Sequence, residues 1–389
     1  MTAVEPALIY LDAAATTPVL PEVLDAMLPA LREQFGNPGS LHRLGAAAAR
    51  ALEEAREAVA RALLCEPGEV LLVSGGTEAN ALALSGALGA RRGPAHVVTS
   101  AVEHPCVQEQ LRLLEAGGLR VTRVAPRRDG GLDPEAVLAA LEPETALVSL
   151  MHVQNETGAV FPLEAVARAA KARSPRILVH GDGVQAWGKL PPPGPEVDLY
   201  AVSAHKVHGP KGAGALRVRR GLRLAPLVPG GGQERGLRGG TEAMPALLGL
   251  GAAARLVPAG RARWAGEVAA LGARLREGLL ALGGQLNSPA DGLPTLWNVS
   301  FPGVPAEPLL HALEARGVFV STGSACSSRQ RKRSPTLQAM GLPAARIDSA
   351  LRWSLPRTLQ AAEVERALEA ARAALAELGF TTPLEGARC

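Results

Sequence analysis

The sequence is poor in aromatic residues, has little net charge and lacks any long apolar run. Aromatic side chains make up 3% of the 389 residues, and the formal net charge is +4. No long basic stripe interleaves with aromatic residues, so we expect no nucleic-acid partner. No apolar run approaches the roughly 18 residues of a membrane span, and the first residues lack the pattern of a signal peptide. We therefore expect a cytoplasmic protein that does not enter a membrane.

Cysteine is scarce, and its spacing excludes the common disulfide and metal patterns. Cys65, Cys106, Cys326 and Cys389 include no Cys-x-x-Cys pair, so we expect neither a disulfide framework nor a zinc site. Cys326 lies among small residues and is followed by a basic run at 329–333, and nearby cations favour the reactive thiolate. This environment suits a nucleophile on a mobile loop. An inert cysteine in a flexible basic loop is the alternative.

Lysine is also scarce, with five lysines against thirty-six arginines. Lys206 follows an apolar run at 198–202 that is typical of a strand buried on both faces, and a glycine-rich segment at 209–214 comes next. Burial there would lower the pKa of the amine, which could then form an imine, as arginine cannot. A surface lysine is the alternative.

A second apolar strand, at 176–181, ends at Asp182. Two strands that end in an aspartate and a lysine match the needs of pyridoxal 5′-phosphate. The lysine holds the aldehyde, and the carboxylate keeps the ring nitrogen protonated. The pair therefore favours a pyridoxal phosphate site.

Helical and strand-like segments alternate along most of the chain, which predicts an α/β protein with a mostly parallel sheet wrapped by helices. We expect a large cofactor-binding domain at 18–248 and a smaller α+β domain made of 1–17 and 249–389. The expected helices cover about 21–34, 43–64, 78–90, 105–116, 134–141, 163–173 and 260–282. The expected strands cover about 70–73, 96–100, 119–125, 145–151, 176–181, 199–203 and 213–218.

Two segments resemble phosphate-binding loops. Gly76 and Thr77 lie between a strand and a helix, where free backbone N–H groups form an anion seat, although Thr77 could instead be a simple helix N-cap. The segment 183–189 fits all but the last position of a P-loop. Leu190 replaces the required Ser or Thr, and prolines at 191–193 prevent the following helix. We therefore reject a nucleotide triphosphatase site.

Three more features are candidates for function. His104 follows the strand at 96–100, where it could stack on a flat cofactor and move protons, or simply cap a helix. Arg352 lies inside an apolar strand and needs an anion, which a substrate carboxylate would supply. The loop at 230–241 is rich in glycine and is either a linker or an anion-binding loop.

Together these motifs resemble the cysteine desulfurases, class V members of the fold-type-I pyridoxal phosphate enzymes. The type with a long mobile cysteine loop, about 324–334, which serves iron–sulfur assembly, is the most similar. The sequence departs from the family pattern at Ala13, Gln154 and Ala204. The motifs that carry the resemblance lie at 10–12, 14–18, 36–38, 74–80, 103–104, 151–156, 182–185, 203–206, 231–234, 238–241, 323–326 and 351–354.

The resemblance implies a role for each matching residue. Lys206 carries the cofactor, His104 stacks on its ring, and Cys326 is the sulfur nucleophile. Arg352 and Asn155 bind the substrate carboxylate. Thr241 reaches the phosphate from a second subunit of a homodimer. The expected cofactor-binding residues are Gly76, Thr77, Asn155, Asp182, Gln185, Ser203, His205, Lys206 and Thr241, and no metal is expected.

The implied reaction takes L-cysteine to L-alanine and leaves a persulfide on Cys326. A sulfur acceptor, such as an iron–sulfur scaffold protein, then removes that sulfur. Two alternatives remain: a selenocysteine lyase or aminotransferase of the same fold, and a non-catalytic sulfur-transfer scaffold. Cys326 argues against a plain aminotransferase.

Overall fold

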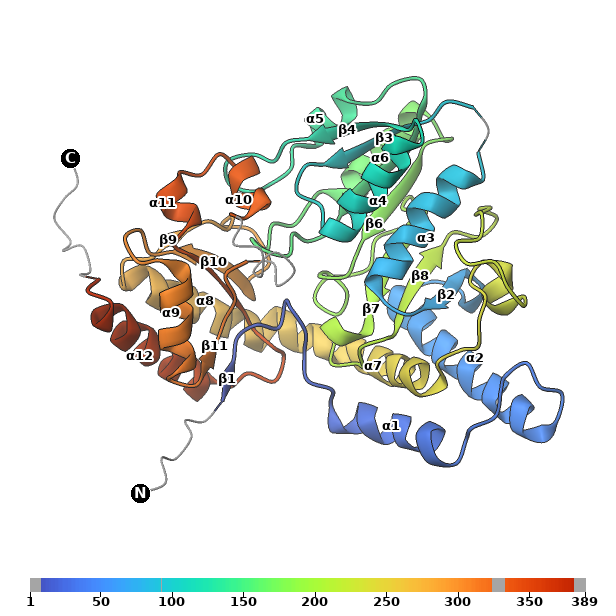
Figure 1. The fold of residues 1–389 in the computed structure, drawn as a ribbon, viewed down its shortest axis with the longest axis horizontal. Helices are drawn as coiled ribbons and strands as arrows, with labels where there is room; N and C mark the ends of the chain where they lie inside the picture. The colour runs from blue at the N-terminus through green and yellow to red at the C-terminus, as the bar shows by residue number, and fades with distance from the viewer. Residues whose placement is uncertain (1–7, 92, 324–332, 381–389) are drawn as a thin grey trace.

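The computed structural model describes residues 8–91, 93–323 and 333–380, and it contains a seven-stranded sheet at its centre (Figure 1). The strand order is β2-β8-β7-β6-β5-β3-β4. Only β8 runs antiparallel to its neighbours, so the predicted mostly parallel sheet is confirmed. The strands are β2 (Val70–Val73), β3 (His96–Ser100), β4 (Arg120–Val124), β5 (Thr145–Met151), β6 (Leu178–Asp182), β7 (Leu199–Ser203) and β8 (Gly214–Val218).

Helices cover both faces of this sheet because its central strands are apolar on both sides. In β2, Val70 and Leu72 belong to the core shared with α2 and α7, whereas Leu71 and Val73 belong to the core shared with α3 and α4. The helices of this part are α1 (Pro21–Arg32), α2 (Arg43–Leu63), α3 (Gly76–Gly89), α4 (Pro105–Ala116), α5 (Pro134–Ala139), α6 (Leu163–Arg173) and α7 (Met244–Arg263).

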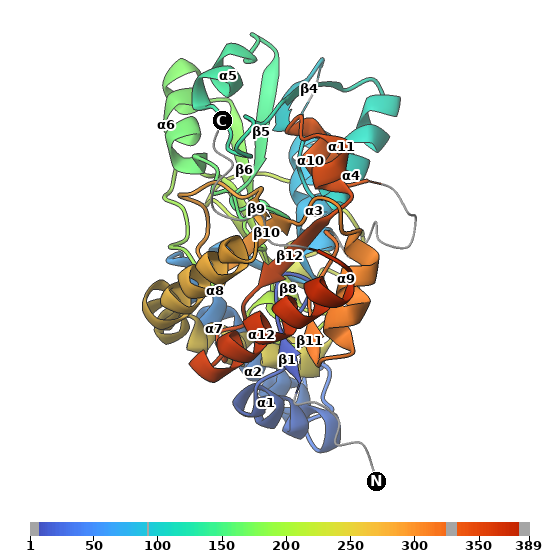
Figure 2. The ribbon, with the colours of Figure 1, turned by 90° about the vertical axis from the view of Figure 1, so that its left-hand side faces the viewer.

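A second core lies beside the first and combines the start of the chain with its last third (Figure 2). β10 pairs with β9 and β12 in an antiparallel sheet, and β1 pairs in parallel with β11. The strands are β1 (Ile9–Tyr10), β9 (Gln285–Leu286), β10 (Leu296–Ser300), β11 (Val318–Phe319) and β12 (Ala350–Ser354). The helices are α8 (Ala269–Ala281), α9 (Ala306–Glu314), α10 (Pro335–Ala339), α11 (Ala344–Ile347) and α12 (Ala361–Glu377).

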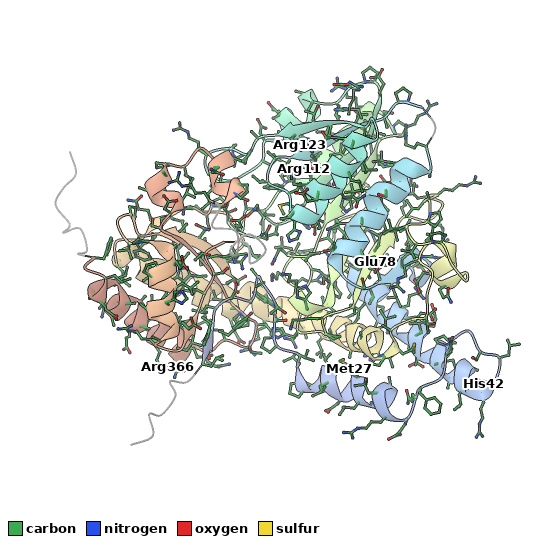
Figure 3. All side chains as sticks on the ribbon, in the orientation of Figure 1. Met27, His42, Glu78, Arg112, Arg123 and Arg366 are labelled. Carbon is green, nitrogen blue, oxygen red and sulfur yellow. The ribbon has the colours of Figure 1, made fainter. Side chains whose placement is uncertain are left out.

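The sequence predicts a helix at about 260–282, and the predicted start of this helix is wrong. The helical run begins at Met244 with α7, passes through one π-helical turn (Trp264–Val268) and continues as α8. α7 packs closely on two helices: a Cβ added to Gly249 would lie 2.8 Å from Met27 of α1, and one added to Gly251 would lie 2.7 Å from Ala55 of α2 (Figure 3). The helix is thus buried around much of its surface and lacks the polar face from which a helix is usually recognised.

The division into domains at residue 248 stays a prediction. The apolar residues of α7 as far as Val257 belong to the core of the large sheet, and Trp264 belongs to the second core. α7 therefore connects the two cores physically (Figure 1). No helix among the described residues is long and apolar enough to cross a membrane.

Candidate active site

A cavity of about 240 Å³ lies at the carboxyl ends of β5, β6 and β7, beside the first turns of α3 and α4. In open α/β sheets this edge is where ligands bind, because loops of several strands meet there. The structure brings nine of the predicted residues together around this cavity: Gly76, Thr77, His104, Asn155, Asp182, Gln185, Ser203, His205 and Lys206.

Lys206 lies in the 3₁₀ turn (Ala204–Lys206) that follows β7, as the sequence predicts. Its Nζ donates to the carbonyl oxygens of Ala14 at 2.6 Å and Ala15 at 2.8 Å. Thr17 in the same N-terminal segment donates from its backbone N and its hydroxyl to the carbonyl of His205. The start of the chain thus closes over the end of β7 and places the amine at the cavity.

Asp182, at the end of β6, is held in place by its neighbours. Its Oδ2 accepts from Nδ2 of Asn80 at 2.8 Å, and its Oδ1 accepts from the backbone N of Val184 at 3.0 Å. Asn80 in turn pairs through Oδ1 with Nε2 of His180 at 3.0 Å, and Nδ1 of His180 pairs with Ser149 at 2.9 Å. Burial lowers the pKa of His180 to about 3, so this buried chain of hydrogen bonds is neutral apart from the carboxylate.

An anion seat lies where α3 begins. The N-cap of α3 is Gly75, and Gly76 and Thr77 occupy its first turn, so the interpretation of Thr77 as the N-cap is wrong. The buried hydroxyl of Ser203 also faces this region and has no hydrogen-bond partner among the described residues. Free helix N–H groups beside an unpartnered hydroxyl are suited to bind a phosphate.

His104 both caps a helix and lines the cavity, so the two interpretations of this residue hold together. Its Nδ1 accepts from the backbone N of Cys106 at 3.2 Å at the start of α4. Burial and the charge of Lys206 lower the pKa of His104, although Asp182 opposes them. The ring is therefore neutral near pH 7, and the cap on Nδ1 leaves its proton on Nε2.

The cysteines that the structure describes are poor nucleophiles. The thiol of Cys106 lines the cavity, 3.0 Å from Nδ1 of His104, and Cys65 is half-buried at the end of α2. Burial raises the pKa of both thiols to about 12, so both stay protonated at neutral pH. The predicted nucleophile, Cys326, lies outside the described residues.

The anion required by Arg352 is present in the chain itself. Arg352 is buried in β12, and its guanidinium donates to Oδ1 of Asp12 at 2.7 Å and to the carbonyl of Asn155 at 2.9 Å. The argument that burial alone demands a substrate carboxylate is therefore wrong. Its Nε is buried and has no partner among the described residues, and Arg352 is not among the residues that line the cavity.

Thr241 is not part of the cavity. It is exposed in the loop between a 3₁₀ turn (Gln233–Gly236) and α7.

Sequence reasoning also missed several residues that line the cavity. Ala15, Asn80 and Cys106 line the cavity, but no role was assigned to them from the sequence.

The chain matches the family model Aminotransferase class-V over residues 9–367. A cysteine desulfurase of Cereibacter sphaeroides is 45% identical over 93% of this chain and 94% of its own length. The cysteine desulfurase IscS of Anaeromyxobacter dehalogenans is 42% identical over 92% and 90%. The chain belongs to the cysteine desulfurase family.

Solved structures agree with this assignment. A NifS-like protein superposes with a TM-score of 0.89 at 34% identity, over 95% of this chain and all of its own. A structure described as SspA in complex with cysteine superposes with a TM-score of 0.81 at 35% identity, over 90% of this chain and 99% of its own. The predicted family, fold type and enzyme class are confirmed, and the cofactor of this desulfurase is pyridoxal 5′-phosphate.

The cavity fits this cofactor. The anion seat at α3 suits its phosphate, Asp182 suits its ring nitrogen, and Lys206 suits its aldehyde. The glycine at position 76 also leaves space, because a Cβ there would lie 2.6 Å from Cγ2 of Val184, which lines the same cavity.

Proposed function

We propose that this desulfurase takes sulfur from L-cysteine with the residues gathered at the ends of β6 and β7. The observation that carries the proposal is the meeting of an amine, a carboxylate and an anion seat around one cavity, at Lys206, Asp182 and the first turn of α3. The neighbouring fold described in complex with cysteine supports the substrate.

The cofactor, when bound, supplies an electron sink that stabilises negative charge at the substrate α-carbon. Lys206 takes the α-proton on Nζ, and the carbonyls of Ala14 and Ala15 orient this amine. Asp182 holds a proton on the ring nitrogen. Thr77, Ser203 and His205 hold the phosphate, and Gln185 with Asn155 binds the ring hydroxyl.

Arg352 and Asn155 hold the substrate carboxylate. His104 exchanges a proton with the substrate thiol at Nε2, the nitrogen that the cap on Nδ1 leaves available.

Sulfur leaves by a nucleophilic step at Cys326. The thiolate attacks the substrate sulfur, a sulfur–sulfur bond forms, and the bond from sulfur to the substrate β-carbon breaks. The β-carbon is then protonated, so alanine leaves and the persulfide stays on the enzyme without an external oxidant. The high pKa values of Cys65 and Cys106 support Cys326 as the nucleophile.

The persulfide then passes to an acceptor protein. The relative named IscS supports an iron–sulfur scaffold among these acceptors. We also propose a homodimer in which Thr241 completes the partner's phosphate site. We place the enzyme in the cytoplasm, where thiols such as those of Cys65 and Cys106 stay reduced.

The test is a comparison of Cys326→Ser with the control Cys65→Ala. After incubation with cysteine and no acceptor, mass spectrometry should find one extra sulfur atom on the peptide that contains Cys326 in wild type and in Cys65→Ala. Cys326→Ser should keep the cofactor and bind cysteine, yet carry no extra sulfur. Extra sulfur on Cys106 instead would overturn the assignment of the nucleophile.

A further inference from the structure

Lys189 is a buried lysine that none of the steps above uses. It lies in the turn after β6, and only 7% of its surface is exposed. Its Nζ donates to Oε1 of Gln185 at 3.1 Å and lies 5.3 Å from the centre of the Trp264 ring. Among the described residues it forms no ion pair with a carboxylate, although buried lysines usually need one. The side-chain hydrogen bond that Lys189 forms within the described residues therefore goes to Gln185, a residue of the cavity.

The contacts of Gln185 determine which way its side-chain amide points. A lysine ammonium only donates hydrogen bonds, and a backbone carbonyl only accepts them. Lys189 therefore fixes Oε1 of Gln185 on its side, and the carbonyl of Ala14 fixes Nε2 at 2.7 Å on the other. A flipped amide would set acceptor against acceptor at Ala14 whatever the charge of Lys189, and donor against donor at the charged form of Lys189. Only one orientation satisfies both neighbours.

The carbonyl of Ala14 also connects this amide to the reactive lysine. It accepts from Nε2 of Gln185 and, at 2.6 Å, from Nζ of Lys206. Lys189, Gln185, Ala14 and Lys206 thus form one continuous chain of hydrogen bonds. We propose that Lys189 is a positioning residue, which holds the Gln185 amide so that its second N–H is available to an acceptor oxygen of the ligand in the cavity. This inference rests on the proposed function in one respect, because it takes the ligand in the cavity to be the cofactor.

Three titratable side chains face Lys189, and each comes from a different part of the chain. Lys206 lies in the 3₁₀ turn after β7, His208 follows that turn, and Arg352 lies in β12. Burial, together with the charges of Lys206 and Arg352, lowers the pKa of Lys189 to about 7. Burial lowers the pKa of His208 to about 4, so this ring is neutral at pH 7. Because no carboxylate among the described residues pairs with Lys189, an apolar residue of similar length should be tolerated at this position.

The test separates positioning from structural support. Lys189→Met keeps the length of the side chain and its contact with Trp264 but removes the donor. The protein should melt at the same temperature as wild type or higher, yet its apo form should bind pyridoxal 5′-phosphate roughly five- to tenfold more weakly, as for the loss of one hydrogen bond. In a Gln185→Leu background, Lys189→Met should cause no further loss of affinity.

Lys171→Met is the matched control. Lys171 bonds to Asp198 and to the carbonyl of Ile177, away from the cavity, so this change should lower the melting temperature and leave cofactor affinity unchanged. The inference would be overturned if Lys189→Met bound the cofactor with wild-type affinity. It would also be overturned if Lys189→Met lost the same affinity in the wild-type and the Gln185→Leu backgrounds. Failure of the proposed function would show differently, as a wild-type holoenzyme that does not release alanine from cysteine.

Discussion

Burial sets the charge of side chains near the cavity, and Glu103 is an example. Its carboxyl group is buried beside His104, and Oε1 accepts from the hydroxyl of Ser100 at 2.5 Å. Oε2 has no partner among the described residues. Burial raises the pKa of Glu103 from 4.5 to about 8, so the folded protein keeps this group neutral at pH 7.

This raised pKa predicts a pH-dependent stability. Between pH 4.5 and 8 the unfolded chain loses the proton of Glu103 and the folded chain keeps it, so wild-type stability falls as the pH rises through this window. Glu103→Gln removes the effect. In denaturant unfolding, the free energy of unfolding of the variant should rise relative to that of wild type by up to about 1.4 kcal/mol per pH unit across the window. A difference that stays constant with pH would show that Glu103 ionises normally.

Lys206→Ala should abolish turnover, because no other amine in the described part of the chain donates to the carbonyls of Ala14 and Ala15. Borohydride treatment of wild type should fix the cofactor to the protein, and mass spectrometry should find it on the peptide that contains Lys206. The variant should show no such label. Cofactor fixed to the variant, with turnover retained, would contradict the assignment.

At the scale of residues, the sequence predicts what lies at the ends of strands and misses what pairs across the fold. Asp182 and Lys206 could be found because each follows an apolar run. The sequence could not reveal that Asn80 and His180 support Asp182. It also could not reveal the ion pair of Arg352 with Asp12. Asp12 and Arg352 are 340 residues apart, and no local pattern shows that they meet.

At the scale of elements, most predicted helices and strands match the structure because turn residues and strong periodicity bound them. α7 is the exception, since buried helices carry little periodicity. The segment after β6 also agrees with the sequence: residues 183–190 form turns and an isolated β-bridge of Trp187 with Leu190, and no helix follows, as the prolines at 191–193 predict.

Glu156 connects two distant elements beside the cavity. Its buried carboxylate follows β5 and accepts from the hydroxyls of Ser334 at 2.7 Å and Thr336 at 2.9 Å, at the start of α10. Glu156→Ala should therefore loosen α10, and amide hydrogen exchange over 334–340 should speed up roughly tenfold or more.

A matched control is available for Glu156. Asp348→Asn breaks an exposed ion pair with Arg333, which stabilises little, so exchange in α10 should hardly change. Equal exchange in Glu156→Ala and wild type would show that α10 does not depend on this carboxylate.

At the scale of the whole molecule, several large apolar side chains are exposed on α1, at the start of α2 and in the segment that connects them: Leu24, Leu31, Phe35, Leu41 and Leu44. Phe35 is 77% exposed, and Leu41 is fully exposed. The same helix α2 holds the loop that carries Thr241, through an ion pair of Arg56 with Glu234 at 2.7 Å. The exposed apolar side chains before the start of α2 support the proposed contact with a second copy.

The double variant Phe35→Asp, Leu41→Asp should therefore dissociate the proposed dimer, because it places charges in an apolar interface. Sedimentation velocity should give a dimer for wild type and a monomer for the variant. The monomer should also bind the cofactor more weakly, since Thr241 of the partner is withdrawn. Leu113→Asp changes an exposed leucine of a different helix, α4, and is the control, so this variant should stay dimeric. A fully active wild-type monomer would contradict the shared site.

The most direct test of the whole account is the stoichiometry of the reaction. The purified holoenzyme is given L-cysteine and a reductant, and alanine and sulfide are measured together over many turnovers. The account predicts that the two products appear in equal amounts and that both are lost in Lys206→Ala. Pyruvate in place of alanine, or alanine without sulfide, would contradict it.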